Sequence, residues 1–195
     1  MIVQGGILAL DLASTTGWAH GIQPCAAPDV GTWKLGKGSE VARMGVFGSE
    51  LSDVVRTHRP SVILLEAPIS FRVMRRFEDA AQQLGLRAVA MAVAWQNQTP
   101  IHEIECLRVR AEMLGSRNFP RGEVKAVVMA YWAKRGVPMP DHNAADAALM
   151  WEWYRLRLTG RPPPLVMAPV RSPGLSMRRT RAAIVRESDI RGGAA

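Results

Sequence analysis

The sequence has few of the features that mark secreted or membrane proteins. It contains only two cysteines in 195 residues, Cys25 and Cys106, and this scarcity excludes a disulfide framework and a cysteine-rich metal site. It also lacks an apolar run of about 20 residues, so we expect no membrane span and no membrane partner. The N-terminus lacks the basic and apolar regions of a secretory signal. Together these absences predict a protein of the reducing cytoplasm.

Acidic residues are in short supply relative to basic ones. The chain has 25 Lys and Arg against 17 Asp and Glu, which gives a formal net charge of +8. Such an excess favours a polyanionic partner, with nucleic acid first, although a charge that serves only solubility is the alternative. Apolar residues make up 48% of the chain, which is enough for the core of one domain.

The pattern of regular structure stops near residue 160. We expect a folded domain over residues 1–160, followed by a basic and disordered tail over 161–195 that is rich in Pro, Ser, Gly and Arg. The tail adds non-specific DNA affinity in one interpretation and is an inert linker in the other.

Apolar patterns within the predicted domain indicate alternating strands and helices. The expected strands cover residues 6–12, 18–22, 31–35, 61–66 and 101–107. The expected helices cover residues 41–57, 75–96, 122–135 and 142–158, with Ser39 and Asp141 as N-caps of the first and the last. This order predicts an α/β fold with a mixed sheet and helices on its faces. Ligands of such sheets gather near the carboxyl ends of the strands.

Three acidic residues stand at informative places. Asp11 lies in the apolar run 7–12, Glu66 closes the run 62–66, and Asp146 lies at the start of the last expected helix. A buried carboxylate is costly unless it is paired, and a shared divalent cation is a common partner. We therefore expect a metal site built from two strands and one helix. Taken singly, each acid also has a structural explanation. Asp11 could be a turn residue, Glu66 a strand-end residue that reaches water, and Asp146 a carboxylate that interacts favourably with the positive end of the helix dipole.

Several segments together resemble a known family. They are residues 7–11 with the turn 14–17, residues 58–60 leading to Glu66, and residues 84–89, 101–104, 109–110 and 145–147. In order and spacing they resemble the ribonuclease H-like superfamily and, more closely, the RuvC-type Holliday junction resolvases, with a phage or prophage branch as one expectation. No single segment is specific, and their order carries the resemblance.

The resemblance implies a mixed five-stranded sheet flanked by helices, and a homodimer that cleaves branched DNA with Mg²⁺ or Mn²⁺. Two ions per site are expected, because many nucleases hydrolyse phosphodiesters with a pair of metal ions. Asp11, Glu66 and Asp146 match the catalytic acids of the family. The family usually has a fourth ligand, acidic or histidine, one helical turn before the last aspartate, but Asn143 occupies that position here. The fourth ligand therefore stays open among Asp141, His142 and Asn143.

Each candidate has an expected role in phosphodiester hydrolysis. Asp11 would bridge two metal ions, Glu66 would bind one of them and Asp146 the other. His142, spaced i, i+4 from Asp146, would ligate a metal or act as general base, although by itself it also suits a capping region. Asn143 would orient a metal-bound water.

Arginines provide the candidate DNA contacts. The resemblance places Arg110 and Arg121 near the scissile phosphate. Arg72, Arg75 and Arg76 follow the Glu66 strand, where they contact phosphates or form a solvated face.

The leading hypothesis is a metal-dependent, structure-selective DNA endonuclease for branched DNA such as Holliday junctions. One alternative is a module that only binds branched DNA, which the departure at Asn143 motivates. Another is a nuclease of the same fold for RNA–DNA hybrids or flaps. Residues 11–17 also resemble the first phosphate loop of actin-like sugar kinases, but no second glycine-rich loop follows, and we expect no nucleotide cofactor.

Overall fold

The structure is a computed structural model that describes residues 5–67, 77–120 and 122–160. The predicted tail lies outside the described residues, as do four candidate DNA-binding arginines, Arg72, Arg75, Arg76 and Arg121. Within the described residues, no helix combines the length and the apolar character needed to cross a bilayer.

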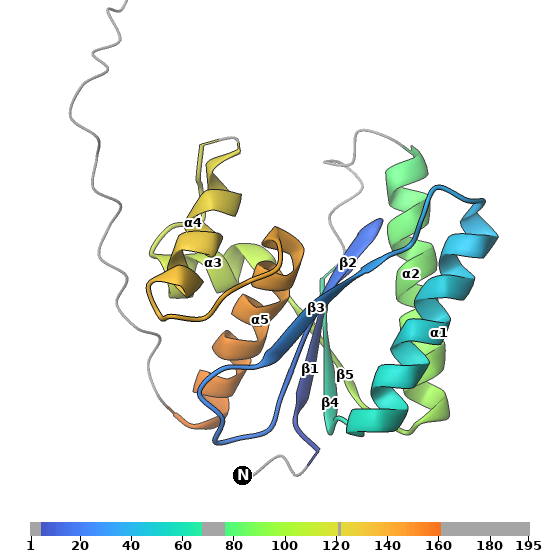
Figure 1. Ribbon diagram of the computed structural model, residues 1–195, viewed down its shortest axis with the longest axis horizontal. Coiled ribbons are helices and arrows are strands. Elements are labelled where there is room, and N and C mark those ends of the chain that lie inside the picture. Colours follow the sequence, from blue (N-terminus) through green and yellow to red (C-terminus); the bar gives the residue numbers. More distant parts are fainter. Residues whose placement is uncertain (1–4, 68–76, 121, 161–195) are drawn as a thin grey trace, which may run out of the picture.

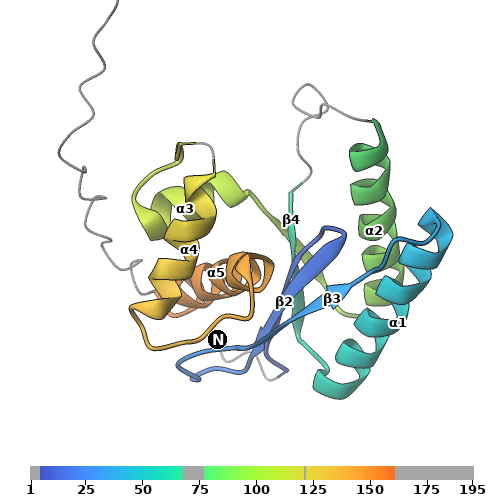
Figure 2. The same ribbon diagram turned by 45° about the horizontal axis from the view of Figure 1, so that its top comes forward.

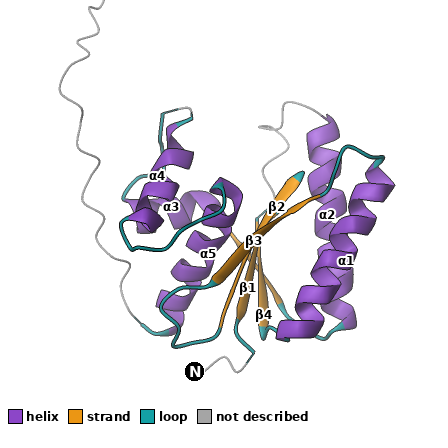
Figure 3. Cartoon of the chain, in the orientation of Figure 1, coloured by secondary structure: helices purple, strands orange, loops and turns teal. Residues whose placement is uncertain are grey.

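The described residues form a five-stranded mixed sheet between two layers of helices (Figures 1 and 3). The strands are β1 (Ile7–Asp11), β2 (Thr15–Gly21), β3 (Asp29–Lys34), β4 (Val62–Glu66) and β5 (Ile101–Ile104). The helices are α1 (Glu40–His58), α2 (Phe77–Gln96), α3 (Cys106–Leu114), α4 (Glu123–Ala133) and α5 (His142–Leu158). The strand order is β3-β2-β1-β4-β5. Strand β4 pairs in parallel with β1 and β5, whereas β2 pairs antiparallel with both β1 and β3. The expected mixed five-stranded sheet is confirmed.

Two expected boundaries were wrong. The strand predicted over 101–107 ends at Ile104, and the missed helix α3 begins at Cys106. An apolar run this short is compatible with a strand or a helix, and burial of Val109, Met113 and Leu114 on one helical face decides for the helix. The strand expected over 18–22 begins earlier, because β2 already starts at Thr15.

Both predicted N-caps are confirmed. The Ser39 hydroxyl accepts a hydrogen bond from the backbone N–H of Ala42 at the start of α1. Asp141 Oδ1 accepts hydrogen bonds from the backbone N–H groups of Asn143 (2.9 Å) and Ala144 (3.0 Å) at the start of α5. These contacts satisfy backbone donors that the first turn of a helix leaves unpaired.

Alternate residues of the central strands face two separate cores. On one face, α1 and α2 pack over a cluster that includes Leu8, Leu10, Ile63 and Leu65. On the other face, α3, α4 and α5 pack over a cluster that includes Ile7, Ala9, Val62 and Leu64. Because strand side chains alternate, Asp11 and Glu66 continue the second series and belong to the face that α5 covers. Figure 2 shows the two helical layers on either side of the sheet.

Small residues allow α5 to lie close to β2. Gly17, Ala19 and Gly21 occupy alternate positions of β2 and therefore share one face. A Cβ atom at Gly21 would lie 2.6 Å from the indole of Trp151, whose Nε1 donates to the Gly21 carbonyl at 3.4 Å. Glycine at this position thus leaves the space that the buried α5 tryptophan occupies.

A charged cluster joins α3 to α5 at the surface. The Glu112 carboxylate accepts hydrogen bonds from Arg108, Arg157 and the Trp153 indole N–H. Burial opposes ionisation of Glu112, but these donors outweigh it and lower its pKa to about 2. The cluster fixes α3 against the helix that carries Asp146.

Candidate active site

The three predicted acids come from three elements that meet at one end of the sheet. Asp11 is the last residue of β1 and Glu66 the last residue of β4, while Asp146 lies in the second turn of α5. Asp11 pairs with Gly17 in β2, and a Cβ atom at Gly17 would lie 2.1 Å from the carbonyl carbon and oxygen of Asn143. The first turn of α5 therefore lies directly against the strand that neighbours Asp11.

The charges of the three carboxylates act on one another. Burial, together with the nearby Asp146 and Glu66 carboxylates, raises the pKa of Asp11 from 3.8 to about 8, against an opposing effect of Arg110. Burial also raises the pKa of Asp146, with Arg110 opposing and Glu66 adding to the rise. The structure thus brings the three acids within electrostatic reach, and the cations of the described chain do not fully neutralise them.

Two basic side chains border this acidic group. Arg110, on α3, lies with Nη2 3.9 Å from Asp146 Oδ1. Lys125, on α4, donates from Nζ to His142 Nε2 at 2.7 Å, and its charge also lowers the pKa of Asp146. Sequence reasoning missed Lys125, and its position in the first turn of α4 gives no local signal for a contact with α5.

The Cys106 thiol, at the start of α3, lies near the Glu66 and Asp11 carboxylates. Burial raises the pKa of Cys106, and the Glu66 and Asp11 carboxylates raise it further. The thiol donates to the Glu66 side chain. Its Sγ also lies 3.8 Å from Met150 Sδ of α5, so Cys106 stays protonated and links Glu66 to the α5 layer. No local pattern indicates that Cys106 lies here, because the short run that carries it also suits a strand.

The three candidates for the fourth ligand lie at the start of α5 and have different partners. Asp141 is engaged in capping the helix, and His142 contacts Lys125. The backbone of Asn143 packs against Gly17. Across the described residues, no three His, Cys, Asp or Glu side chains already converge closely enough to hold a metal ion.

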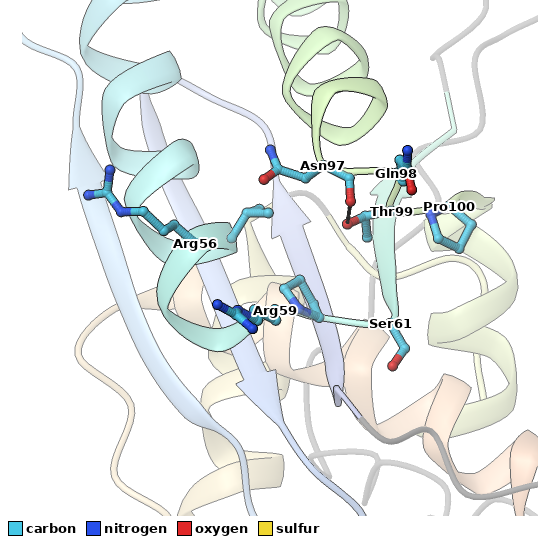
Figure 4. A pocket seen from close by; sticks show the side chains of 9 residues that line it. Arg56, Arg59, Ser61, Asn97, Gln98, Thr99 and Pro100 are labelled. Carbon is cyan, nitrogen blue, oxygen red and sulfur yellow. Dashed lines mark hydrogen bonds between the residues drawn. The ribbon is translucent and has the colours of Figure 1, made fainter.

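A separate hollow of about 390 Å³ lies at the other end of the parallel strands (Figure 4). Its lining includes Arg56 and Arg59 at the end of α1, Ser61 before β4, and residues 97–100 between α2 and β5. Arg56 lies in the last turn of α1 and Arg59 is its C-cap residue, so both positive charges stabilise the negative end of the helix dipole. None of the three predicted acids lines this hollow.

The fold has known counterparts among solved structures, although comparison by sequence finds no match. No protein-family model matches the chain, and no characterised protein matches it by sequence. Among solved structures, Thermus thermophilus RuvC superposes with a TM-score of 0.59 at 17% identity, covering 80% of this chain and 98% of that one. This chain has the RuvC fold. The RuvC fold is a form of the ribonuclease H-like fold, so the fold expected from the sequence is confirmed.

Two further structures share the RuvC fold. Thermus thermophilus RuvC in complex with a Holliday junction substrate matches with a TM-score of 0.60 at 17% identity, covering 80% of this chain and 98% of that chain. The yeast mitochondrial Holliday junction resolvase Ydc2 matches with a TM-score of 0.55 at 12% identity, covering 82% and 83%. None of these structures supports the expected phage or prophage branch.

Proposed function

We propose that this protein is a metal-dependent, structure-selective endonuclease that hydrolyses phosphodiester bonds of branched DNA such as Holliday junctions. One observation carries the proposal. Carboxylates from β1, β4 and α5 gather at the carboxyl end of a RuvC-type sheet, and burial together with their repulsion raises the pKa of Asp11 to about 8. Perturbed carboxylates at the ligand-binding end of an α/β sheet are typical of a functional site.

The donor set fits a hard divalent cation. Mg²⁺ and Mn²⁺ prefer carboxylate oxygens, and a divalent charge would relieve the repulsion that raises the pKa of Asp11. Asp11, Glu66 and Asp146 would hold the ions, two per site, with His142 or Asn143 contributing to one of them. When bound, the ions supply an activated water and stabilise charge on the leaving oxygen.

The basic residues at the border act on the phosphate. Arg110 lies beside Asp146, where its guanidinium would bind a phosphate oxygen and hold the scissile group over the acids. Lys125 would add positive charge on the α4 side. The candidates Arg72, Arg75, Arg76 and Arg121 remain predictions for DNA contacts further away.

A homodimer would place one site on each of two symmetric strands of a junction. The outer face of α2 suits such an interface. Phe77 (83% exposed), Leu84 (44%), Met91 (44%) and Trp95 (82%) recur at intervals of seven, seven and four residues, within the part of the chain that the structure describes. This spacing aligns them in one apolar stripe along the helix, and a second copy of α2 would cover it.

We expect Met91→Asp to convert the dimer to a monomer, because two carboxylates would face each other in the apolar seam. Analytical ultracentrifugation at micromolar concentration measures the change. Glu78→Asp, a conservative change on the same helix, should leave the dimer intact. A wild-type protein that sediments as a monomer would contradict the interface.

Substitution at the fourth ligand position favours one alternative. Asn143 cannot supply an anionic oxygen, so a protein that binds branched DNA without cutting it is the second candidate. A ribonuclease H-like nuclease for RNA–DNA hybrids or flaps is a variant of the first.

Cleavage of four labelled substrates separates these functions. The substrates are a four-way junction, a linear duplex of the same sequence, a flap and an RNA–DNA hybrid, each with Mg²⁺ or Mn²⁺. We expect paired nicks in the junction and at least about 100-fold slower cleavage of the duplex. Tight junction binding without cutting would favour the binding module, and preferential cutting of the hybrid or flap would reassign the substrate.

A further inference from the structure

Arg87 is a buried charge on the face of the sheet that lies opposite the acidic site. It belongs to α2 and is only 8% exposed, with the buried apolar residues Leu86 and Ala90 beside it. Burial lowers the pKa of its guanidinium, since the interior disfavours the charged form. A charge in this position is costly without partners, so its contacts identify what it does.

Both partners of Arg87 are at the carboxyl ends of β4 and β5. Its Nη1 donates a hydrogen bond to the main-chain oxygen of Glu66 at 2.9 Å, and its Nη2 forms an ion pair with the Glu103 carboxylate of β5. Glu103 is the more exposed member of the pair, with 45% of its side chain accessible against 10% for Arg87.

The main chain needs this support at Glu66. Pairing of β1 with β4 runs from Ile7↔Val62 to Leu10↔Leu65 and stops one residue before Glu66. On the β5 side, the N–H of Ala67 donates to the Ile104 oxygen at 2.8 Å. Arg87 therefore supplies a donor to the Glu66 carbonyl at the point where the ladder to β1 ends, and with Ala67 it fixes the peptide group after Glu66.

The Glu103 carboxylate compensates the positive charge of the buried Arg87 guanidinium. Without Glu103, the guanidinium would be a buried charge held only by the Glu66 main-chain oxygen, which is costly. Glu103 thus neutralises Arg87 and leaves it bound to the main chain.

We propose that Arg87, held by Glu103, is a positioning residue that fixes the end of β4 so that the Glu66 carboxylate faces the metal site. The inference rests on the proposed function and adds residues from the opposite face of the sheet to it. Arg87 does not contact substrate or metal, and it acts only through Glu66.

The test measures metal binding separately from activity and from stability. Mn²⁺ is titrated into the metal-free full-length protein, and the metal concentration for half-maximal thermal stabilisation is compared for wild type, Arg87→Gln, Glu103→Gln and Leu86→Ala. Leu86→Ala is the matched control, because it removes a fully buried neighbour on α2 without touching Glu66. Junction cleavage is then measured at saturating Mn²⁺.

Arg87→Gln should raise the half-saturating Mn²⁺ concentration by about tenfold or more, as expected when support for a metal ligand is lost. Glu103→Gln should raise it by a smaller factor, and it keeps the inference testable if Arg87→Gln fails to fold. Leu86→Ala should lower the melting temperature and leave the half-saturating concentration unchanged, and cleavage by the Arg87 and Glu103 variants should recover at saturating metal.

A half-saturating concentration that is unchanged in both Arg87→Gln and Glu103→Gln would overturn the positioning role. So would a rise of equal size in Leu86→Ala, since it would reflect lost stability alone. A wild-type protein that neither binds Mn²⁺ nor cuts the junction would overturn the proposed function, and the inference with it.

Discussion

Asp11→Asn should make the metal-free protein more stable at pH 8, although it removes a proposed catalytic group. Burial and the neighbouring Asp146 and Glu66 carboxylates raise the pKa of Asp11 from 3.8 to about 8. Asparagine has nearly the same shape and carries no charge, so it removes the repulsion without leaving a cavity. A proposed active-site residue would thus be a source of instability, as expected when function requires like charges close together.

The pH dependence follows from the direction of this shift. Between about pH 4 and pH 8 the folded protein holds a proton on Asp11 that the unfolded chain releases, so the stability of the wild type falls as pH rises through this range. A shift of one pKa unit corresponds to about 1.4 kcal/mol, and relaxation of the site reduces the full effect. We expect Asp11→Asn to raise the free energy of unfolding by roughly 2–5 kcal/mol at pH 8 and by almost nothing at pH 4.

Thermal unfolding in EDTA at pH 4, 6 and 8 measures this gain. Asp53→Asn is the matched control, since Asp53 lies on the exposed side of α1 with 64% of its side chain accessible. The control should change stability by less than about 0.5 kcal/mol at every pH. The difference in melting temperature between Asp11→Asn and wild type should increase from pH 4 to pH 8. A constant difference would contradict the claim that a charged Asp11 destabilises the metal-free protein.

Gly17→Ala should destabilise the protein by about 3 kcal/mol or more and abolish junction cleavage. A Cβ atom at this position would lie 2.1 Å from main-chain atoms of Asn143, which cannot rotate away as the end of a side chain can. The methyl group would push the first turn of α5 away from β2. Asp146, which follows in the next turn, would move away from Asp11.

Urea unfolding and junction cleavage, measured on the same preparation, test this result. Gly45→Ala is the matched control, because Gly45 lies in α1 and a Cβ atom there would meet nothing within 4 Å. The free energy of unfolding of Gly45→Ala should rise by about 0.5–1 kcal/mol, because alanine has the higher helix propensity, and junction cleavage should be unchanged. Normal stability and cleavage in Gly17→Ala would show that α5 does not need this close approach.

The strand pattern of the sequence predicts much of the site. The alternation of Ile7, Ala9 and Asp11 already indicates that the acid shares a face with core residues, and the run that ends in Glu66 gives the same indication. The cap at Asp141 predicts where α5 begins, and hence that Asp146 lies near its N-terminus. These signals are local, because they depend on neighbours in the chain.

The remaining contacts could not be predicted, because they join residues far apart in the sequence. Lys125 and His142 meet only because α4 packs on α5. Cys106 reaches Glu66 from a helix whose short apolar run also suits a strand. Arg87 stands in an Ala-rich helix whose pattern gives no sign of a partner at the end of β4.

The measurement that tests the central claim most directly is a time course of four-way junction cleavage by wild type and Asp11→Asn, with Mg²⁺ and with EDTA. We expect paired, symmetric nicks from the wild type only when Mg²⁺ is present. Asp11→Asn should bind the junction as well as wild type does and cut it at least about 1,000-fold more slowly, which corresponds to about 4 kcal/mol of lost transition-state stabilisation. Equal cleavage by both proteins, or cleavage in EDTA, would contradict a metal-dependent site at Asp11.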